Sequence, residues 1–144
     1  MPFVASELVW ECVKNKNAFI RTSRNCPKMS AEPGNLMGLH MATYSGIANA
    51  KSLDVKSEID GKKGSIVLVT KGKKTQKPNN MFNGMGVSKC IKKGVEALDK
   101  NIDSKFYRRD LLNLARTKYK KVRASYKKNK NIMMPKKAKA SAAE

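Results

Sequence analysis

The spacing of apolar residues changes several times along the chain, and each change predicts a different structural element. Apolar residues recur at helical spacing in residues 5–15, which predicts a short first helix whose N-terminus is capped by Ser6. Residues 17–24 alternate as a brief strand does. Two prolines and a glycine predict a loop at residues 25–35, and residues 36–50 fit either a short helix or extended structure.

The strongest strand pattern lies in residues 52–71. Leu53, Val55 and Ile59 alternate with polar residues, an Asp-Gly pair follows, and a β-branched run then returns. This order predicts an antiparallel β-hairpin. Residues 71–86 are first basic and then polar and glycine-rich, with nothing to bury, so they predict a loop or linker.

Helical spacing returns after residue 88. Apolar residues recur at i, i+4, i+7 and i+11 from Ile91 to Ile102, which predicts an amphipathic helix. Residues 101–110 interrupt this pattern, and residues 108–128 predict a second, longer and basic helix. Residues 129–144 combine a proline, lysines and small residues, as is typical of a flexible tail.

Together these elements predict an α+β fold. A small N-terminal domain with a short helix and an antiparallel hairpin or sheet is followed by two C-terminal helices and a flexible tail. We place the α+β domain at residues 1–86, the basic helical region at 87–128 and the basic tail at 129–144. A chain of 144 residues is long enough for this arrangement.

The charge of the chain adds a functional expectation to this fold. Thirty-one Lys and Arg residues against 11 Asp and Glu residues give a net charge of +20. Such a chain repels itself, which favours an anionic partner, and nucleic acid is the first candidate. Lysines outnumber arginines 25 to 6, which fits contact with phosphates better than bidentate reading of bases.

The basic charge lies mainly in the C-terminal half, where residues 87–144 hold 18 basic and 5 acidic residues and no acidic residue occurs from Leu111 to Ala143. This half contains the predicted helix at residues 108–128. At about 100° per residue, Tyr119 and Tyr126 fall on an apolar face that is predicted to pack on the core. Five cations fall on a separate narrow stripe: Arg109, Arg116, Lys120, Arg123 and Lys127. We expect this stripe to have no partner within the chain and to contact nucleic-acid phosphates; the alternative is an ordinary solvated face.

Two further features of the sequence leave alternatives open. Tyr107 is suited either to core packing or to stacking on an unpaired base. The lysines at the exit of the hairpin suit either a solubilising loop or a loop that follows a nucleic-acid backbone: Lys71, Lys73, Lys74 and Lys77.

The residues needed for catalysis or metal binding are not grouped in this sequence. Cys12, Cys26 and Cys90 are far apart and odd in number, and His40 has no neighbouring ligand type. We therefore expect no metal, no cofactor, no small-molecule substrate and no enzymatic activity. No run of apolar residues is long enough to span a bilayer, and the first ten residues do not resemble a signal peptide. We expect a soluble intracellular protein.

Five short motifs occur in an order that resembles a known family. They are SELVW at 6–10, NAF at 17–19, EPGNL at 32–36, YSGIA at 44–48 and YRRDL at 107–111. Their order and spacing are similar to those of the eukaryote-specific protein family numbered twenty-eight of the large ribosomal subunit, which is unrelated to its bacterial namesake.

This resemblance implies a structural protein of the large subunit that lies against ribosomal RNA and neighbouring large-subunit proteins. It implies a place on cytoplasmic ribosomes after assembly in the nucleolus, and no catalysis. It also implies RNA contacts at Asn35, His40 and Tyr44, although residues 37–43 are less basic than the family pattern leads us to expect.

Two alternatives to the ribosomal interpretation remain. A nucleolar assembly factor shares the N-terminal domain but is expected to carry a cysteine cluster and an acidic extension, and neither is present here. A chromatin or general DNA-binding protein would share the basic face but would usually show a groove-entering module.

The predicted RNA-binding residues are Arg21, Arg24, Asn35, His40, Tyr44, Lys51, Lys71, Lys73, Lys74, Lys77, Arg108, Arg109, Arg116, Lys120, Lys121, Arg123, Lys127 and Lys128.

Overall fold

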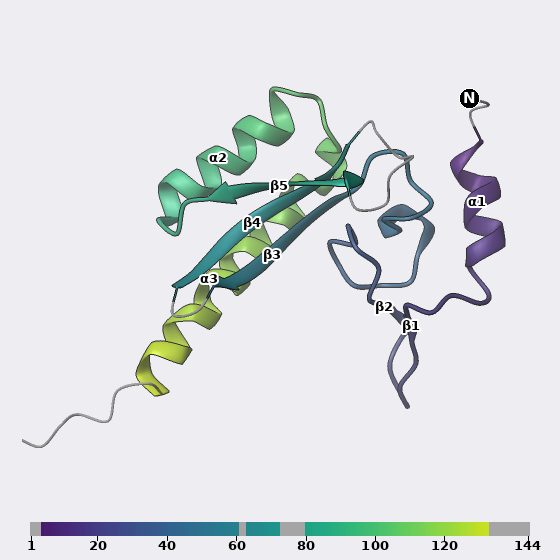
Figure 1. The fold of residues 1–144 in the computed structure, drawn as a ribbon, viewed down its shortest axis with the longest axis horizontal. Coiled ribbons are helices and arrows are strands. Elements are labelled where there is room, and N and C mark those ends of the chain that lie inside the picture. The colour runs from purple at the N-terminus through teal and green to yellow at the C-terminus, as the bar shows by residue number, and fades with distance from the viewer. Residues whose placement is uncertain (1–3, 61–62, 73–79, 133–144) are drawn as a thin grey trace, which may run out of the picture.

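The computed structural model describes residues 4–60, 63–72 and 80–132 and has the predicted α+β fold (Figure 1). The elements in chain order are α1 (Ser6–Val13), β1 (Ile20–Arg21), β2 (Met29–Ser30), the 3-10 turn η1 (Ala42–Tyr44), β3 (Leu53–Asp60), β4 (Lys63–Lys71), β5 (Phe82–Val87), α2 (Ile91–Asp103), the 3-10 turn η3 (Arg109–Leu111) and α3 (Leu112–Ile132).

A three-stranded antiparallel sheet of order β3-β4-β5 forms the centre of the molecule. Val55 pairs with Leu68 in the predicted hairpin, and Ile66 pairs with Val87 on its other side. The prediction of a loop or linker at residues 71–86 is therefore wrong for its last part. The glycines of β5 give no alternating side-chain pattern, so this strand forms by backbone pairing with β4 and is anchored by buried Val87.

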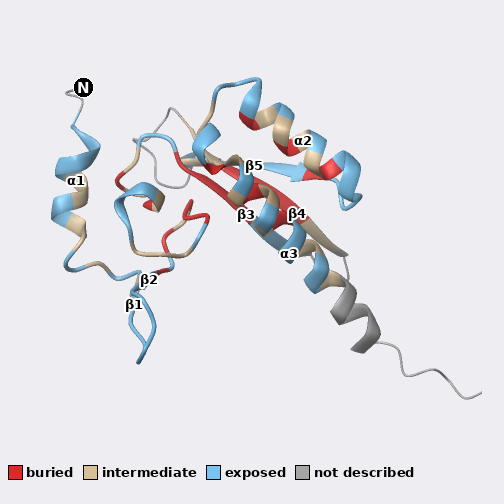
Figure 2. Ribbon diagram, turned by 180° about the vertical axis from the view of Figure 1, so that it is seen from behind, coloured by how far each residue is buried: buried red, intermediate tan, exposed pale blue. Residues whose placement is uncertain are grey.

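Helices α2 and α3 cover one face of this sheet, with α3 lying along β3 and β4 (Figures 1 and 2). Alternate strand residues share a face, so Val55 and Leu68 point together toward these helices. Leu98 and Ile102 from α2 and Ala115 from α3 complete the buried core there, each no more than 1% exposed. The α2 prediction is confirmed, although Ile91 of the predicted core stripe is 45% exposed.

Close packing between the two helices depends on Gly94. The ring of Tyr119 is fully buried, and its hydroxyl donates a hydrogen bond to the carbonyl oxygen of Ser88 at 2.6 Å. A Cβ atom at position 94 would lie 1.9 Å from that hydroxyl oxygen. Glycine lowers helix propensity here, but it leaves the space that Tyr119 occupies.

The last helix begins later and ends later than its predicted range of residues 108–128. Arg108 has a left-handed backbone with φ of 48°, and a 3-10 turn follows before α3 starts at Leu112. Arg109 therefore lies outside α3. The helix continues to Ile132, so residues 129–132 are helical and not part of a tail. Residues 133–144 lie outside the described part of the chain.

The N-terminal third differs from its predictions in three places. Ser6 is the first helical residue and not the cap, because Ala5 holds that position and makes no side-chain hydrogen bond. The predicted strand is reduced to two residues, and it pairs with β2 inside the predicted loop, with Ile20 opposite Ser30. Residues 36–50 contain only the 3-10 turn η1. These short elements depend on distant pairing and therefore leave little local signal.

Buried polar contacts hold this N-terminal third together. The carboxylate of Glu32 is 4% exposed and accepts hydrogen bonds from Ser45 Oγ at 2.7 Å and Asn17 Nδ2 at 3.3 Å. A parallel bridge between Asn35 and Leu53 joins the same segment to the edge of the sheet. The loop segment is consequently fixed beside β3.

The packing of Tyr119 on Gly94 can be tested by Gly94→Ala. We expect the free energy of unfolding to fall by about 1–3 kcal/mol because the new methyl group overlaps Tyr119. The higher helix propensity of alanine, acting alone, would instead raise the free energy of unfolding by about 1 kcal/mol. Urea unfolding measures the difference. Glu96→Ala on the exposed side of α2 is the control, expected within about 0.5 kcal/mol of the parent. A Gly94→Ala protein more stable than the parent would contradict the packing.

Candidate nucleic-acid interface

The solvent-facing side of α3 is polar and carries lysines. Ala115 and Tyr119 are buried against the sheet, so residues on the opposite side of the helix face outward. Thr117, Lys120 and Lys121 are exposed there. Neither lysine forms a hydrogen bond or ion pair with the residues that the structure describes, and both ammonium groups are available to an external anion.

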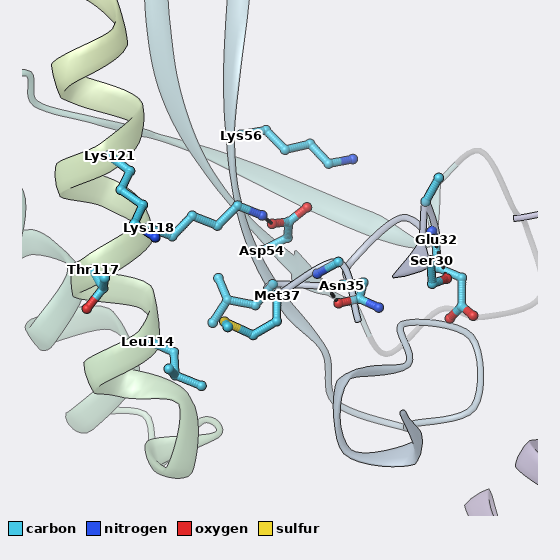
Figure 3. A pocket seen from close by; sticks show the side chains of 13 residues that line it. Ser30, Glu32, Asn35, Met37, Asp54, Lys56, Leu114, Thr117, Lys118 and Lys121 are labelled. Atoms are coloured by element: carbon cyan, nitrogen blue, oxygen red, sulfur yellow. Dashed lines mark hydrogen bonds and ion pairs between the residues drawn. The ribbon is translucent and has the colours of Figure 1, made fainter. Parts of the chain in front are cut away.

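A groove of about 460 Å³ lies beside this surface, between the segment 30–38, strand β3 and helix α3 (Figure 3). Lys56 of β3 and Lys118 and Lys121 of α3 line it, so cations reach the groove from two elements. We call this groove, together with Lys120, which is exposed on α3 but does not line it, the lysine groove. Its remaining lining is mixed: it includes apolar Leu36, Met37 and Leu114, small or polar residues such as Ser30, and the carboxylates of Glu32 and Asp54.

Asp54 supplies a negative charge at the base of the lysine groove. Its side chain is 5% exposed and forms an ion pair with Lys118 (Figure 3). The same carboxylate oxygen accepts a hydrogen bond from the backbone N–H of Val55 at 2.7 Å. Lys118 is thus largely neutralised within the chain, whereas Lys56 and Lys121 keep their charges for the solvent side.

The predicted stripe of cations differs from this surface, because its arginines have partners within the chain. Arg116 Nε lies 2.8 Å from a carboxylate oxygen of Asp99, and Arg109 Nε lies 2.8 Å from one of Asp103. The expectation of a stripe without internal partners is therefore wrong. Arg109 and Arg116 lie against α2, whose acidic residues were not visible from the pattern of α3 alone.

Arg123 contacts the segment just before α2, since its Nε donates a hydrogen bond to the carbonyl oxygen of Lys89 at 2.7 Å. Of the predicted stripe, Lys120 alone has a described side chain with no such contact. Lys127 lies in α3 beside Lys128, but both side chains fall outside the described set. Lys73, Lys74 and Lys77 also lie outside the described residues. RNA contact by all of these residues stays a prediction.

Lys71 serves as an internal clamp at the end of the hairpin. Its ammonium group donates hydrogen bonds to the carbonyl oxygens of Gly46, Ile47 and Asn49 at 2.8–3.0 Å. Burial lowers the pKa of this ammonium from its usual value. The side chain holds residues 46–49 against the sheet, so it is not a free surface cation.

Tyr107 closes the same end of the hairpin. Its hydroxyl lies 2.9 Å from the carbonyl oxygen of Ser52 and accepts a hydrogen bond from the N–H of Lys71 at 3.1 Å. Burial raises the pKa of this hydroxyl. Of the two uses left open for Tyr107, the structure supports packing. Lys51 is exposed nearby, with its ammonium 5.8 Å from the Tyr107 ring centre.

Arg108 joins this closed end to the N-terminal third. Its guanidinium donates hydrogen bonds to the carbonyl oxygens of Thr43 at 2.8 Å and Lys51 at 3.1 Å. It also forms an ion pair with Asp110 at 2.9 Å. The structure therefore brings Tyr44, Lys51 and Arg108 to one region, where Arg108 acts within the chain.

The residues implied by the family resemblance are also engaged in the fold. Asn35 is 4% exposed, and its amide bonds to Leu39 and Gly38 shape the turn between them. His40 Nε2 lies 2.9 Å from the carbonyl oxygen of Lys14, and its ring packs on Trp10. These contacts give both residues a role in the fold, and their contact with RNA stays a prediction.

Two predicted residues lie elsewhere. Arg21 ends β1 and Arg24 lies in the loop that joins β1 to β2, and both are exposed. This short hairpin lies on the side of the molecule near α1, away from α3 (Figure 1). The structure therefore does not bring these arginines into the lysine groove.

Comparison with known families identifies the chain. The model of the Ribosomal L28e protein family matches residues 8–125, which include the sheet, α2 and most of α3. The chain belongs to the Ribosomal L28e protein family. Membership confirms the expected resemblance and assigns this L28e chain to a class of ribosomal structural proteins, not enzymes.

Individual relatives agree with the family match. The large ribosomal subunit protein eL28 of Caenorhabditis elegans is 33% identical over 99 residues, 68% of this chain and 75% of that protein. The eL28 protein of Dictyostelium discoideum is 39% identical over 59 residues, 41% of this chain and 43% of that protein. The Schizosaccharomyces pombe eL28 is 25% identical over 134 residues, which cover 90% and 98% of the two chains.

Two further findings concern the described residues of this L28e chain. No group of three or more His, Cys, Asp or Glu residues is arranged there to hold a metal ion. None of the helices in the described ranges has the length and apolar character required to cross a bilayer.

Sequence reasoning missed part of the lysine groove. Lys56, Thr117 and Lys118 were not among the predicted residues, yet all three line it. A signal for Lys56 was present, because it occupies a polar position in the alternating pattern of β3. Lys118 lies about half a turn from the predicted stripe, and only the position of β3 brings it to the groove.

The ion pair beneath the groove predicts a stability effect. Lys118→Met leaves the buried Asp54 carboxylate without its cation, and we expect the free energy of unfolding to fall by about 1–3 kcal/mol. Adding Asp54→Asn should recover part of this loss, because the charge is then removed as well. Urea unfolding provides the measurement. Lys121→Met is the exposed control, and equal losses for Lys118→Met and Lys121→Met would contradict the role of the pair.

Proposed function

We propose that this protein is a structural constituent of the large ribosomal subunit and binds ribosomal RNA through the lysine groove. The observation that carries this proposal is the pair Lys56 and Lys121, which line the groove from β3 and α3, together with Lys120 on the exposed surface of α3. These lysines are exposed and free of hydrogen bonds and ion pairs with the described residues. Membership of the L28e family and the names of its eL28 relatives support the choice of partner.

The groove suits a sugar-phosphate backbone. Lysine ammonium groups contact phosphates as point charges, and each contact releases condensed counterions. Cations on β3 and α3 border the groove from two sides, so a strand following it meets positive charge on both. Asp54 does not repel that strand, since Lys118 neutralises it. Such binding positions RNA without reading its sequence.

This proposal extends to partners and place in the cell. It puts neighbouring large-subunit proteins beside this chain, with the protein on cytoplasmic ribosomes and its assembly in the nucleolus.

The domain division at residues 1–86, 87–128 and 129–144 remains part of the proposal. The described sheet and the helices α2 and α3 nevertheless share one core cluster. A general DNA-binding protein and a nucleolar assembly factor are the competing functions.

The role of the lysine groove can be tested by the salt dependence of RNA binding. Replacing Lys56, Lys120 and Lys121 together by Gln should reduce the slope of log K against log salt by about two units. The reduction follows from the loss of three phosphate contacts. Binding to large-subunit ribosomal RNA is measured by filter retention over a series of salt concentrations.

The matched control removes the same amount of charge from α2, where Lys92, Lys93 and Lys100 are exposed. Their replacement by Gln should leave the slope within about half a unit of the parent. Equal slopes for the two triple variants would reject the lysine groove as the contact. Competition with duplex DNA against folded ribosomal RNA separates the ribosomal function from a general DNA-binding one.

Assembly in cells tests the wider proposal. After sedimentation of a lysate at moderate salt, we expect the protein in the large-subunit and polysome fractions. Protein that stays at the top of the gradient would contradict a ribosomal role. Protein found only with nuclear precursors and absent from polysomes would favour the assembly factor instead.

A further inference from the structure

The loop between α2 and η3 exposes an aromatic ring that the fold does not use. Phe106 is 68% exposed, more than any other large hydrophobic residue in the described part of the chain. Its neighbour Tyr107 is instead tied into the hairpin by its hydroxyl. Because most of this ring stays in water, it adds little hydrophobic stabilisation to the fold, and core packing does not explain a phenylalanine at this position.

The backbone holds Phe106 in an unusual conformation. Its φ is 48°, and Arg108 two residues later has the same value. Bulky side chains rarely adopt this left-handed region, and such strain persists only where surrounding contacts enforce it. Those contacts are the hydrogen bonds from the N–H groups of Phe106 to Asp103 and of Tyr107 to Ile102. The ring is therefore held outward by a fixed loop.

Arg109 covers one side of this ring. The central carbon of its guanidinium lies 4.1 Å from the ring centre of Phe106. Its Nε is held at 2.8 Å by the carboxylate of Asp103, so the guanidinium is oriented before any ligand arrives. Arginine and aromatic planes are the two side-chain surfaces on which unpaired RNA bases stack. Here the two surfaces already lie against each other.

We propose that Phe106, supported by Arg109, is a stacking platform for an unpaired RNA base. This inference rests on the proposed function, since it names the part of the RNA that a second surface of the protein would contact. Lys105 is exposed directly before Phe106 in the chain, and exposed Lys51 has its ammonium 5.8 Å from the Tyr107 ring centre, so positive charge for adjoining phosphates is close. Stacking requires no particular base, because every base has an aromatic face.

The test compares single-stranded and duplex RNA. The probe is a twelve-nucleotide oligoadenylate with one 2-aminopurine, whose fluorescence falls when the base stacks, against a duplex RNA of equal charge. Phe106→Asn keeps a residue that tolerates positive φ but removes the ring. We expect it to weaken binding of the single strand about 5- to 100-fold and to abolish the fluorescence change.

Binding of the duplex and the salt slope should stay at their parent values, because no phosphate contact is lost. Phe106→Trp keeps an aromatic plane and should restore single-strand binding. Phe19→Asn is the matched control, since Phe19 is another partly exposed phenylalanine at 37%, and it should bind as the parent does. Thermal unfolding of each variant checks that the loop change leaves the fold intact.

The outcomes separate this inference from the proposed function. If Phe106→Asn binds the single strand as tightly as the parent while the lysine-groove variant loses salt dependence, the platform is rejected and the groove stands. If the parent binds neither RNA, both proposals fail. If Phe106→Asn lowers incorporation into large subunits without affecting RNA binding, the ring contacts a neighbouring protein, and the platform is again rejected.

Discussion

The ring of Tyr119 occupies the space that a side chain at position 94 would fill, and the rest of the C-terminal half depends on this contact. It brings α3 against the start of α2, where the Tyr119 hydroxyl reaches the carbonyl oxygens of Ser88 and Cys90. Those carbonyls follow directly after β5 in the chain. One buried ring therefore sets the positions of two helices and the end of an edge strand.

This packing also determines how the basic charge is divided. With α2 close to α3, Asp99 and Asp103 lie within reach of arginines on and before α3. Arginine forms oriented hydrogen bonds through its planar group, and lysine remains a compact, well-hydrated charge. In the C-terminal half the arginines Arg108, Arg109, Arg116 and Arg123 join segments of the chain. Lys120 and Lys121 have no such partner among the described residues and stay exposed.

The regular parts of the fold could be predicted from sequence because their signal is local. The β3–β4 hairpin and α2 each carry a clear period in their own residues, and both are present. Strand β5 could not be predicted because its glycines show no period, and pairing with β4 alone makes it a strand. The pairing of β1 with β2 likewise joins residues eight and ten apart across a loop. These elements are products of tertiary contact.

The candidate interface was harder to predict than the fold. A helical wheel separates the apolar side of a helix from its polar side, but it does not tell which part of the polar side meets a neighbouring helix. The stripe from Arg109 to Arg123 was expected to have no partner within the chain, because the helical wheel of residues 108–128 does not include the acidic residues of α2. Lys56 was missed because it belongs to a different element.

Asp54 has a consequence beyond the ion pair that it forms. Strand β3 is an edge of the sheet, and an edge strand with free N–H groups can pair with a strand of another molecule. The Asp54 carboxylate accepts the N–H of Val55, and Lys118 adds a charged side chain at the same point. This stretch of the edge is therefore less open to strand addition by a second copy of the chain.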